Sequence, residues 1–228
     1  QFMHTSLAQT QCRRAVFEAP QWLRAEWGSC DWTGAQLGGN LFHKLDMRGW
    51  AAPESRLDAA QFIECDLRGV DLRQASLAGA TFLGCQLDGA RLAGAQLASA
   101  VFAQGCSLRE AELSHADLSQ ANLGGGVAAG ARLVKASLKG AHLSECDLSG
   151  CDLRLSDATG ALARRTRLRG ALLAGANLRE AVLTYADLRS ADLRGSNLFG
   201  ADLTRVQLDD ATRFDGALTQ RARTWPRL

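Results

Sequence analysis

Large apolar side chains recur at every fifth position along almost the whole chain. The stretch ADLRSADLRGSNLFGADL, residues 186–203, has leucine at 188, 193, 198 and 203. Five residues advance about 500° around an α-helix, and on a strand they send alternate side chains to opposite faces, so neither element gathers these leucines on one side. The pattern therefore predicts a repeat architecture in which each five-residue unit contributes one large inward side chain.

The five-residue pattern extends over residues 15–212 with one interruption. A single extra residue in FAQGCSL, residues 102–108, shifts the frame by one near 103–107. After this shift every fifth residue up to position 208 is leucine, except Ala128, Ala158 and Ala163, and a small residue lies two positions before each. We expect Ala158 and Ala163 to leave a thinner core. In WAAPE, residues 50–54, Trp50 stands where a small residue belongs and Pro53 removes a donor from the ladder of hydrogen bonds, which together predict a local bulge.

A second period of twenty residues lies inside the first. Aromatic residues recur at Trp22, Phe42, Phe62, Phe82 and Phe102. A recurrence of twenty means that every fourth unit returns to the same place. We call the large residue of each five-residue unit its central residue. If the chain turns by about 90° after each unit, all central residues point inward and each coil stacks on the one before it, with neighbouring strands about 4.8 Å apart. The leucines then share an axis rather than a face.

These units resemble the pentapeptide-repeat family, whose pattern is often written A(D/N)LXX. CDLRG at 65–69, ADLSQ at 116–120, ANLRE at 176–180 and ADLRS at 186–190 all match it. The resemblance implies an all-β fold, a right-handed, four-sided parallel β-helix of about ten coils. We expect residues 1–14 to lead into a β-helix over 15–212.

Both ends of the predicted β-helix need closing. Four successive central positions at the start of the chain are aromatic and predict a plug, namely Phe17, Trp22, Trp27 and Trp32. At the other end the apolar residues have helical spacing and a proline follows them, which predicts a short capping helix within residues 213–228. The residues with this spacing are Phe214, Leu218, Ala222 and Trp225.

Composition and charge are ordinary for a folded domain. The chain has 228 residues, of which 46% are apolar and 22% charged, with a net charge of +2. This balance indicates no strongly charged partner, so direct nucleic-acid binding is not expected. No apolar run is long enough to span a membrane, the N-terminus does not resemble a secretory signal, and the seven cysteines show no disulfide or metal spacing. We therefore expect a cytoplasmic protein that does not bind a membrane.

No enzymatic site emerges from the repeat. The four histidines, His4, His43, His115 and His142, would lie too far apart to assemble a catalytic group. The cysteines at 65, 85, 106 and 146 occupy the small inward slot, where we expect them to act as compact apolar groups. The interior would be filled by facing side chains, which leaves no room for a substrate. We predict no catalytic residue, no cofactor and no metal.

The outward positions supply two candidate interaction surfaces. One side of the predicted coil carries an apolar strip, which consists of Leu41, Ile63, Leu83, Val101, Leu162, Val182 and Tyr185. A corner of the coil carries an arginine cluster, which consists of Arg164, Arg165, Arg167 and Arg169. The strip favours a protein partner or a second copy of the chain. The cluster has the chemistry to bind phosphates or an acidic partner, but no aromatic residues interleave it, and the sequence favours solvated charges.

Two functions remain open. The first is a non-enzymatic scaffold for protein–protein interaction, as a free rod or as a segment of a larger bacterial protein. The second follows from the resemblance, because some pentapeptide-repeat proteins bind bacterial DNA gyrase, imitate duplex DNA and protect this topoisomerase from quinolone-type inhibitors. Such mimicry needs a markedly acidic surface. The sequence instead interleaves its aspartates with arginines, which favours the scaffold.

Overall fold

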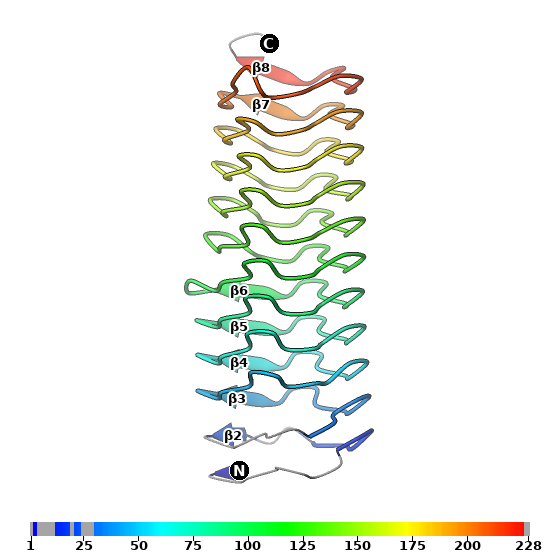
Figure 1. Ribbon diagram of the computed structural model, residues 1–228, viewed down its shortest axis with the longest axis vertical. Helices are drawn as coiled ribbons and strands as arrows, with labels where there is room; N and C mark the ends of the chain where they lie inside the picture. The colour runs from blue at the N-terminus through cyan, green and yellow to red at the C-terminus, as the bar shows by residue number, and fades with distance from the viewer. Residues whose placement is uncertain (1, 4–11, 19–20, 24–29, 226–228) are drawn as a thin grey trace.

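The protein is a straight stack of coils with its two ends at opposite ends of the stack (Figure 1). The structure, a computed structural model, describes residues 2–3, 12–18, 21–23 and 30–225. These residues form an all-β, parallel β-helix of about ten coils, and each coil has four sides. The predicted fold class is confirmed.

Short parallel strands mark one side of the stack. Six of them form one sheet in chain order and two pair near the C-terminus. They are β1 (Phe2–Met3), β2 (Gln21–Leu23), β3 (Leu41–His43), β4 (Gln61–Ile63), β5 (Thr81–Leu83), β6 (Val101–Ala103), β7 (Asp202–Thr204) and β8 (Arg223–Trp225). Isolated parallel bridges connect the coils on the other sides, for example between Asp71 and Arg91. Partners are twenty residues apart, and the separation becomes twenty-one across the predicted insertion near 103–107, where Val101 pairs with Asn122.

Each five-residue unit folds in the same way. In CDLRG, residues 65–69, the first and third residues are buried, the second is half-buried, and the last two form an exposed turn. Alternation along an extended segment explains why Cys65 and Leu67 point inward while Asp66 points outward. Main-chain hydrogen bonds to the coils below and above fix the register, from Asp66 N to Leu45 O at 2.9 Å and from Leu67 N to Gln86 O at 2.7 Å. The backbone groups are therefore satisfied by neighbouring coils.

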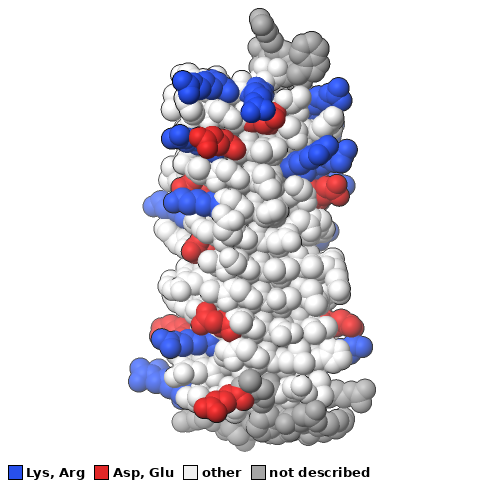
Figure 2. All heavy atoms as spheres, turned by 180° about the vertical axis from the view of Figure 1, so that it is seen from behind, with Lys and Arg blue, Asp and Glu red and all other residues white. Residues whose placement is uncertain are grey.

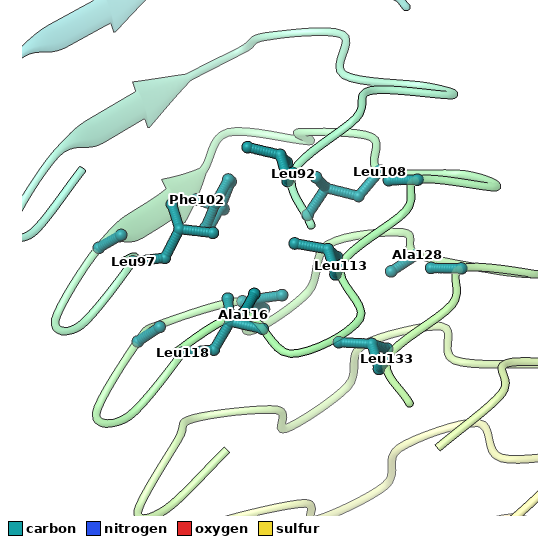
Figure 3. Close-up of a cluster of buried hydrophobic side chains, with 14 of the residues drawn as sticks. Leu92, Leu97, Phe102, Leu108, Leu113, Ala116, Leu118, Ala128 and Leu133 are labelled. Carbon is teal, nitrogen blue, oxygen red and sulfur yellow. The ribbon is translucent and has the colours of Figure 1, made fainter. Parts of the chain in front are cut away.

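The interior is filled by the central residues of all four sides. Figure 3 shows Leu92, Leu97, Phe102, Leu108 and Leu113 converging from successive units of the chain. On the strand-bearing side the phenylalanines stack directly, with ring centroids 4.7 Å apart for Phe42 and Phe62 and 4.9 Å apart for Phe62 and Phe82. We call this side the phenylalanine side. The twenty-residue aromatic period thus corresponds to one column of stacked rings.

The bulge expected at residues 50–54 does not form. Ala51 bridges both Asp31 and Asp71 in the regular register. Trp50 is buried in the slot that holds a small residue elsewhere, and it packs against Phe42 at 6.0 Å between ring centroids. Ala52 takes the central slot that holds a large residue elsewhere. The two substitutions exchange volume within one unit, so the backbone keeps its path.

The core is thinner where two central leucines are missing. A buried cavity of about 20 Å³ lies beside Ala158 and Ala163, with Leu143 and Leu153 among the lining residues. Ser156 also lines it, and its hydroxyl has no hydrogen-bond partner among the described residues. A cavity of this size holds about one water molecule and no substrate. The prediction of a thinner core at this point is confirmed.

The predicted C-terminal capping helix is wrong for the described residues, 213–225. These residues add one more coil instead, because Asp192 pairs with Arg213, Asn197 with Leu218, and β7 with β8. A second single-residue insertion precedes this coil, since partner spacing changes from twenty (Asp187 with Gln207) to twenty-one. The exposed backbone of the preceding coil explains the outcome.

A helix in this segment would leave those backbone groups without partners. The coil instead satisfies them, for example from Arg223 N to Ala201 O at 2.8 Å. The new frame places Thr219 and Thr224 at central positions and turns Leu218 outward, where it is 49% exposed. The helical spacing of the apolar residues was therefore coincidental.

At the N-terminal end the predicted aromatic plug is present as far as the chain is described. Phe17, Trp22 and Trp32 form one cluster, with ring centroids 5.3 Å apart for Phe17 and Trp22 and 5.4 Å apart for Phe17 and Trp32. Trp22 also donates from Nε1 to Oδ1 of the buried Asn40 at 2.8 Å. Trp27, the fourth predicted member, lies outside the described residues.

Candidate interaction surfaces

The phenylalanine side is the least charged side of the stack. Its outward positions between Gln61 and Leu162 hold no Lys, Arg, Asp or Glu; we call them the uncharged strip. They are Gln61, Ile63, Thr81, Leu83, Val101, Ala103, Asn122, Gly124, His142, Ser144 and Leu162. Figure 2 shows this face, with charged side chains at its margins and ends and none along the middle. Because the face is built from in-register strands and bridges, it is flat.

The structure brings some of the predicted apolar residues together and separates others. Ile63 and Leu83 are direct register partners, and so are Leu162 and Val182. Leu41 and Val101 lie in the other outward row, and Gln61 and Thr81 separate them. The apolar residues are half-buried, apart from Leu162, which is 37% exposed. The predicted strip is therefore two separate pairs rather than a continuous apolar band: Ile63 and Leu83 lie within the uncharged strip, and Leu162 and Val182 lie at its end beside Arg164.

Two exposed leucines were not among the residues predicted from the sequence. Leu155 is 57% exposed and Leu172 is 39% exposed. Both belong to the side opposite the phenylalanine side, where Leu172 bridges Asp152 and Asp192. Leu155 occupies a turn position with φ of 60°, and its side chain covers Gly175 of the next coil. A leucine in the place of the usual turn glycine or polar residue was the signal that could have revealed it.

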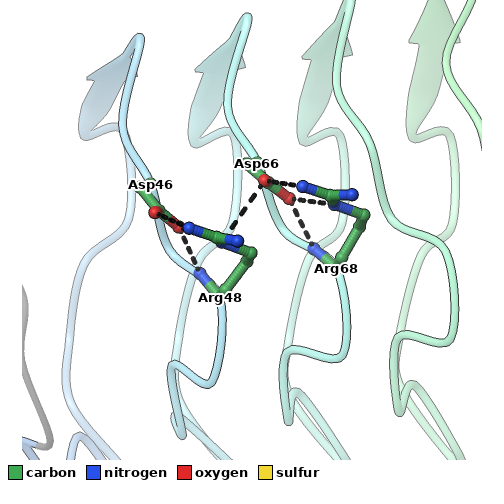
Figure 4. Close-up of polar contacts among 4 residues, drawn as sticks. All are labelled: Asp46, Arg48, Asp66 and Arg68. Atoms are coloured by element: carbon green, nitrogen blue, oxygen red, sulfur yellow. Dashed lines mark hydrogen bonds and ion pairs between the residues drawn. The ribbon is translucent and has the colours of Figure 1, made fainter.

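The aspartates of the D-L-R units, and of the similar D-M-R unit at residues 46–48, are neutralised within their own unit. The arginine folds back onto the aspartate two residues before it, as Figure 4 shows for Asp46 with Arg48 and Asp66 with Arg68. The pairs with this geometry are Asp46–Arg48, Asp66–Arg68, Asp71–Arg73, Asp152–Arg154, Asp187–Arg189 and Asp192–Arg194, at 2.5–2.7 Å. Hydrogen bonds from the partner arginines hold the pKa of Asp46 and of Asp192 at about 2. The rows of aspartate thus do not create a strongly negative face.

The predicted arginine cluster spans a corner. Arg164 points outward on the phenylalanine side, Arg165 occupies the turn, and Arg167 and Arg169 lie on the next side. Arg167 bridges Asp147 and Asp187 in register. Arg164 and Arg165 lie instead beside Tyr185, at 5.7 and 5.5 Å from the ring centroid. Arg164 and Arg165 therefore lie beside an aromatic ring, whereas Arg167 lies between aspartates of the neighbouring coils.

The cysteines form part of the core. All seven are buried, and Cys65, Cys85, Cys106, Cys146 and Cys151 are free thiols. The thiols of Cys65 and Cys85 donate to main-chain oxygens of the coil below, Phe42 O at 3.4 Å and Phe62 O at 3.3 Å. Hydrogen bonds with the neighbouring thiols, together with burial, raise the pKa of Cys85. Burial also raises the pKa of Cys146 to about 12. At these two positions the buried, protonated thiol is a poor nucleophile and a poor metal ligand.

Titratable side chains do not converge in the described part of the chain. Over residues 2–3, 12–18, 21–23 and 30–225, no three His, Cys, Asp or Glu side chains are placed to hold a metal ion. His43 and His142 lie on the phenylalanine side but several coils apart, and His115 occupies a turn elsewhere. His4 lies outside the described residues. Among those same residues, no helix is long and apolar enough to cross a membrane.

Comparison with known proteins identifies the repeat. The family model for the pentapeptide repeat region matches residues 55–133. The model for pentapeptide repeats (8 copies) matches residues 128–160, 164–198 and 176–212. The chain belongs to the pentapeptide-repeat family. No curated protein matches its sequence.

Solved structures of pentapeptide-repeat proteins resemble the chain. HetL, involved in heterocyst differentiation regulation in the cyanobacterium Nostoc sp. strain PCC 7120, is 25% identical with a TM-score of 0.64, over 85% of this chain and 88% of HetL. QnrB1, a plasmid-mediated fluoroquinolone resistance protein, is 22% identical with a TM-score of 0.41, over 75% of this chain and 92% of QnrB1. Rfr23 of the cyanobacterium Cyanothece 51142 is 34% identical with a TM-score of 0.26, over 48% of this chain and 64% of Rfr23.

Proposed function

We propose that the protein is a non-enzymatic scaffold that binds a protein partner, or a second copy of itself, through the uncharged strip of the phenylalanine side. The observation that carries this proposal is that the middle of this face lacks charge (Figure 2), whereas two of the other sides carry Asp–Arg pairs such as Asp66–Arg68 and Asp71–Arg73. A flat, weakly polar face exposes little that must be desolvated at a cost, so it suits contact with another protein. A rigid stack keeps that face in place.

The proposal is tested by charging the strip. Ile63→Glu with Leu83→Glu places two carboxylates on register partners in its middle. The fold should be unchanged, because both side chains point outward, while binding of the partner, or self-association, should fall by about ten-fold or more. Pull-down from the native host and light scattering are the measurements.

The matched control puts the same two charges on a neighbouring side. Ala78 and Ala98 are half-buried outward residues on successive coils, as Ile63 and Leu83 are. Ala78→Glu with Ala98→Glu should leave binding within about two-fold of wild type. If both folded double variants behave alike, the strip is not the binding surface.

The alternative, a DNA mimic that protects gyrase, is weaker on electrostatic grounds. A groove built for phosphates requires a dense array of unpaired negative charge. The aspartates of the D-L-R units are instead held by arginines of the same units. A gyrase supercoiling assay with added protein separates the two functions: the scaffold predicts no change in supercoiling or in inhibitor sensitivity, and protection of the enzyme would favour the mimic.

A further inference from the structure

Three guanidinium groups surround one tyrosine ring near the C-terminal end of the phenylalanine side. The guanidinium carbons of Arg164, Arg165 and Arg205 lie 5.7, 5.5 and 5.5 Å from the ring centroid of Tyr185. Arg205 also donates from Nη1 to the Tyr185 hydroxyl at 2.9 Å. We call these four residues the arginine–tyrosine cluster. Attraction between a cation and the face of an aromatic ring orients each guanidinium.

The stacking of the coils builds this cluster. Val182 pairs in register with Leu162 below and Asp202 above, so the residues three positions later, Arg165, Tyr185 and Arg205, lie one above another at the same corner. All three occupy turn positions with φ of 55–62°. Main-chain hydrogen bonds anchor the corner, from Arg165 N to Thr184 O and from Tyr185 N to Thr204 O. The ring is therefore fixed between two arginines.

The arginines of the cluster differ from those of the D-L-R units. In ALARRTRLRG, residues 161–170, Leu162 and Arg167 replace the aspartates that would otherwise neutralise the arginines. Among the described residues, Arg164 and Arg205 have no carboxylate within ion-pair distance, and Arg165 reaches only Glu145, at 3.9 Å. Residues 161–180 hold five arginines and one glutamate. The cluster thus gathers exposed, largely unneutralised guanidiniums at a place where they repel one another.

We propose that the arginine–tyrosine cluster binds the carboxylates of an acidic peptide segment. Planar guanidiniums donate two parallel hydrogen bonds to a carboxylate, and pre-orientation by the ring lowers the entropy lost on binding. The site is small, since Arg165 and Arg205 are two coils apart, about 10 Å. Glu145 lies one coil below Arg165, and Asp202 lies above Val182.

These flanking carboxylates favour a short acidic peptide over a nucleic acid. A DNA duplex carries one negative charge per about 1.7 Å of axis and would extend across Glu145 and Asp202. One or two glutamate side chains of an extended peptide would instead fit between them. The cluster is separate from Ile63 and Leu83, so binding here does not depend on the strip having a partner.

The test uses fluorescence anisotropy of a labelled oligoglutamate peptide with the full chain. Arg165→Gln with Arg205→Gln should weaken binding by about ten-fold, which corresponds to about 1.4 kcal/mol. The matched control, Arg73→Gln with Arg194→Gln, removes the same charge from arginines already bound to their own aspartates. It should change binding by less than about two-fold.

Two further variants separate an organised site from a general positive field. Tyr185→Leu removes the ring without changing any charge and should weaken binding, whereas Tyr185→Phe keeps the ring face and should retain it. Ile63→Glu with Leu83→Glu should bind the peptide as wild type does, which keeps this test independent of the proposed scaffold function. The proposal is overturned if the wild type does not bind oligoglutamate, if both arginine pairs weaken binding equally, or if duplex DNA competes at lower concentration than the peptide.

Discussion

The phenylalanine side and the side opposite it share one backbone path and one register, yet their outward surfaces differ. Between Gln61 and Leu162 the outward positions of the phenylalanine side carry no charge, while over the same stretch the opposite side carries the pairs Asp71–Arg73 and Asp152–Arg154. Inward, both sides present large apolar residues and small ones in alternation. The fold therefore constrains the inward positions and leaves the outward positions free to vary. The contrast between the sides is therefore where a function of this protein is to be sought.

The largest loss of stability is expected when a charge is placed at an inward position. Leu143→Asp on the phenylalanine side and Leu178→Asp on a neighbouring side each place a carboxylate among buried leucines that offer it no partner. The free energy of unfolding should fall by several kcal/mol in both, because a buried carboxylate without a partner is strongly destabilising. Thermal melts followed by circular dichroism measure the effect.

The control lies one residue away. Arg179 is exposed, and Arg179→Asp should leave the melting temperature almost unchanged. If all three variants melt alike, the assignment of inward and outward positions is wrong.

A smaller change in stability is expected at one inward position of the phenylalanine side. Ala163 occupies a central position that holds phenylalanine or leucine in most other coils, and it lines the buried cavity. Ala163→Leu restores the leucine that the coils below and above hold at this position, Leu143 and Leu183, and should stabilise the fold by about 1 kcal/mol and raise the melting temperature by a few degrees. Ala141→Leu, in the small slot of the phenylalanine side one coil below, should lower it, because Ala141 does not line the cavity and its slot is already filled. A destabilised Ala163→Leu variant would show that the coil has adjusted its spacing to the alanine.

Acid should distinguish the paired sides from the uncharged strip. Hydrogen bonds from Arg48 and Arg194 hold the pKa of Asp46 and Asp192 at about 2, below the value of about 3.9 in an unfolded chain. The stabilisation is therefore complete above about pH 4 and is lost as the pH falls toward 2. Asp46→Asn with Asp192→Asn should flatten this part of the stability curve measured by urea unfolding. An unchanged acid slope would mean that these pairs do not contribute.

The inward positions could be predicted from the sequence because large and small side chains recur there with a period of five residues. It did not reveal the last coil, in which Thr219 and Thr224 take central positions and a second single-residue insertion shifts the frame. There the apolar residues had helical spacing by coincidence, and only the unpaired edge of the previous coil decides the outcome. The exchange of volumes between Trp50 and Ala52 could not be inferred from either residue alone.

The candidate surfaces were predicted only in part. Ile63 and Leu83 share an outward row because they are twenty residues apart, and the sequence was sufficient for this. The arginine–tyrosine cluster was missed because Arg205 lies far from residues 164–169 in the chain. Arg165, Tyr185 and Arg205 are spaced by twenty residues, and this spacing indicates that they lie at the same corner of successive coils.

Site-specific photo-crosslinking in the native host tests whether the uncharged strip is the binding surface. A photoreactive phenylalanine analogue at position 83 lies in the middle of the strip, and the same analogue at position 98 lies on a neighbouring side at a half-buried outward position. We predict a discrete crosslinked species from position 83, containing a partner or a second copy of the chain, and none from position 98. The same products from both positions, or no product from position 83, would contradict the account.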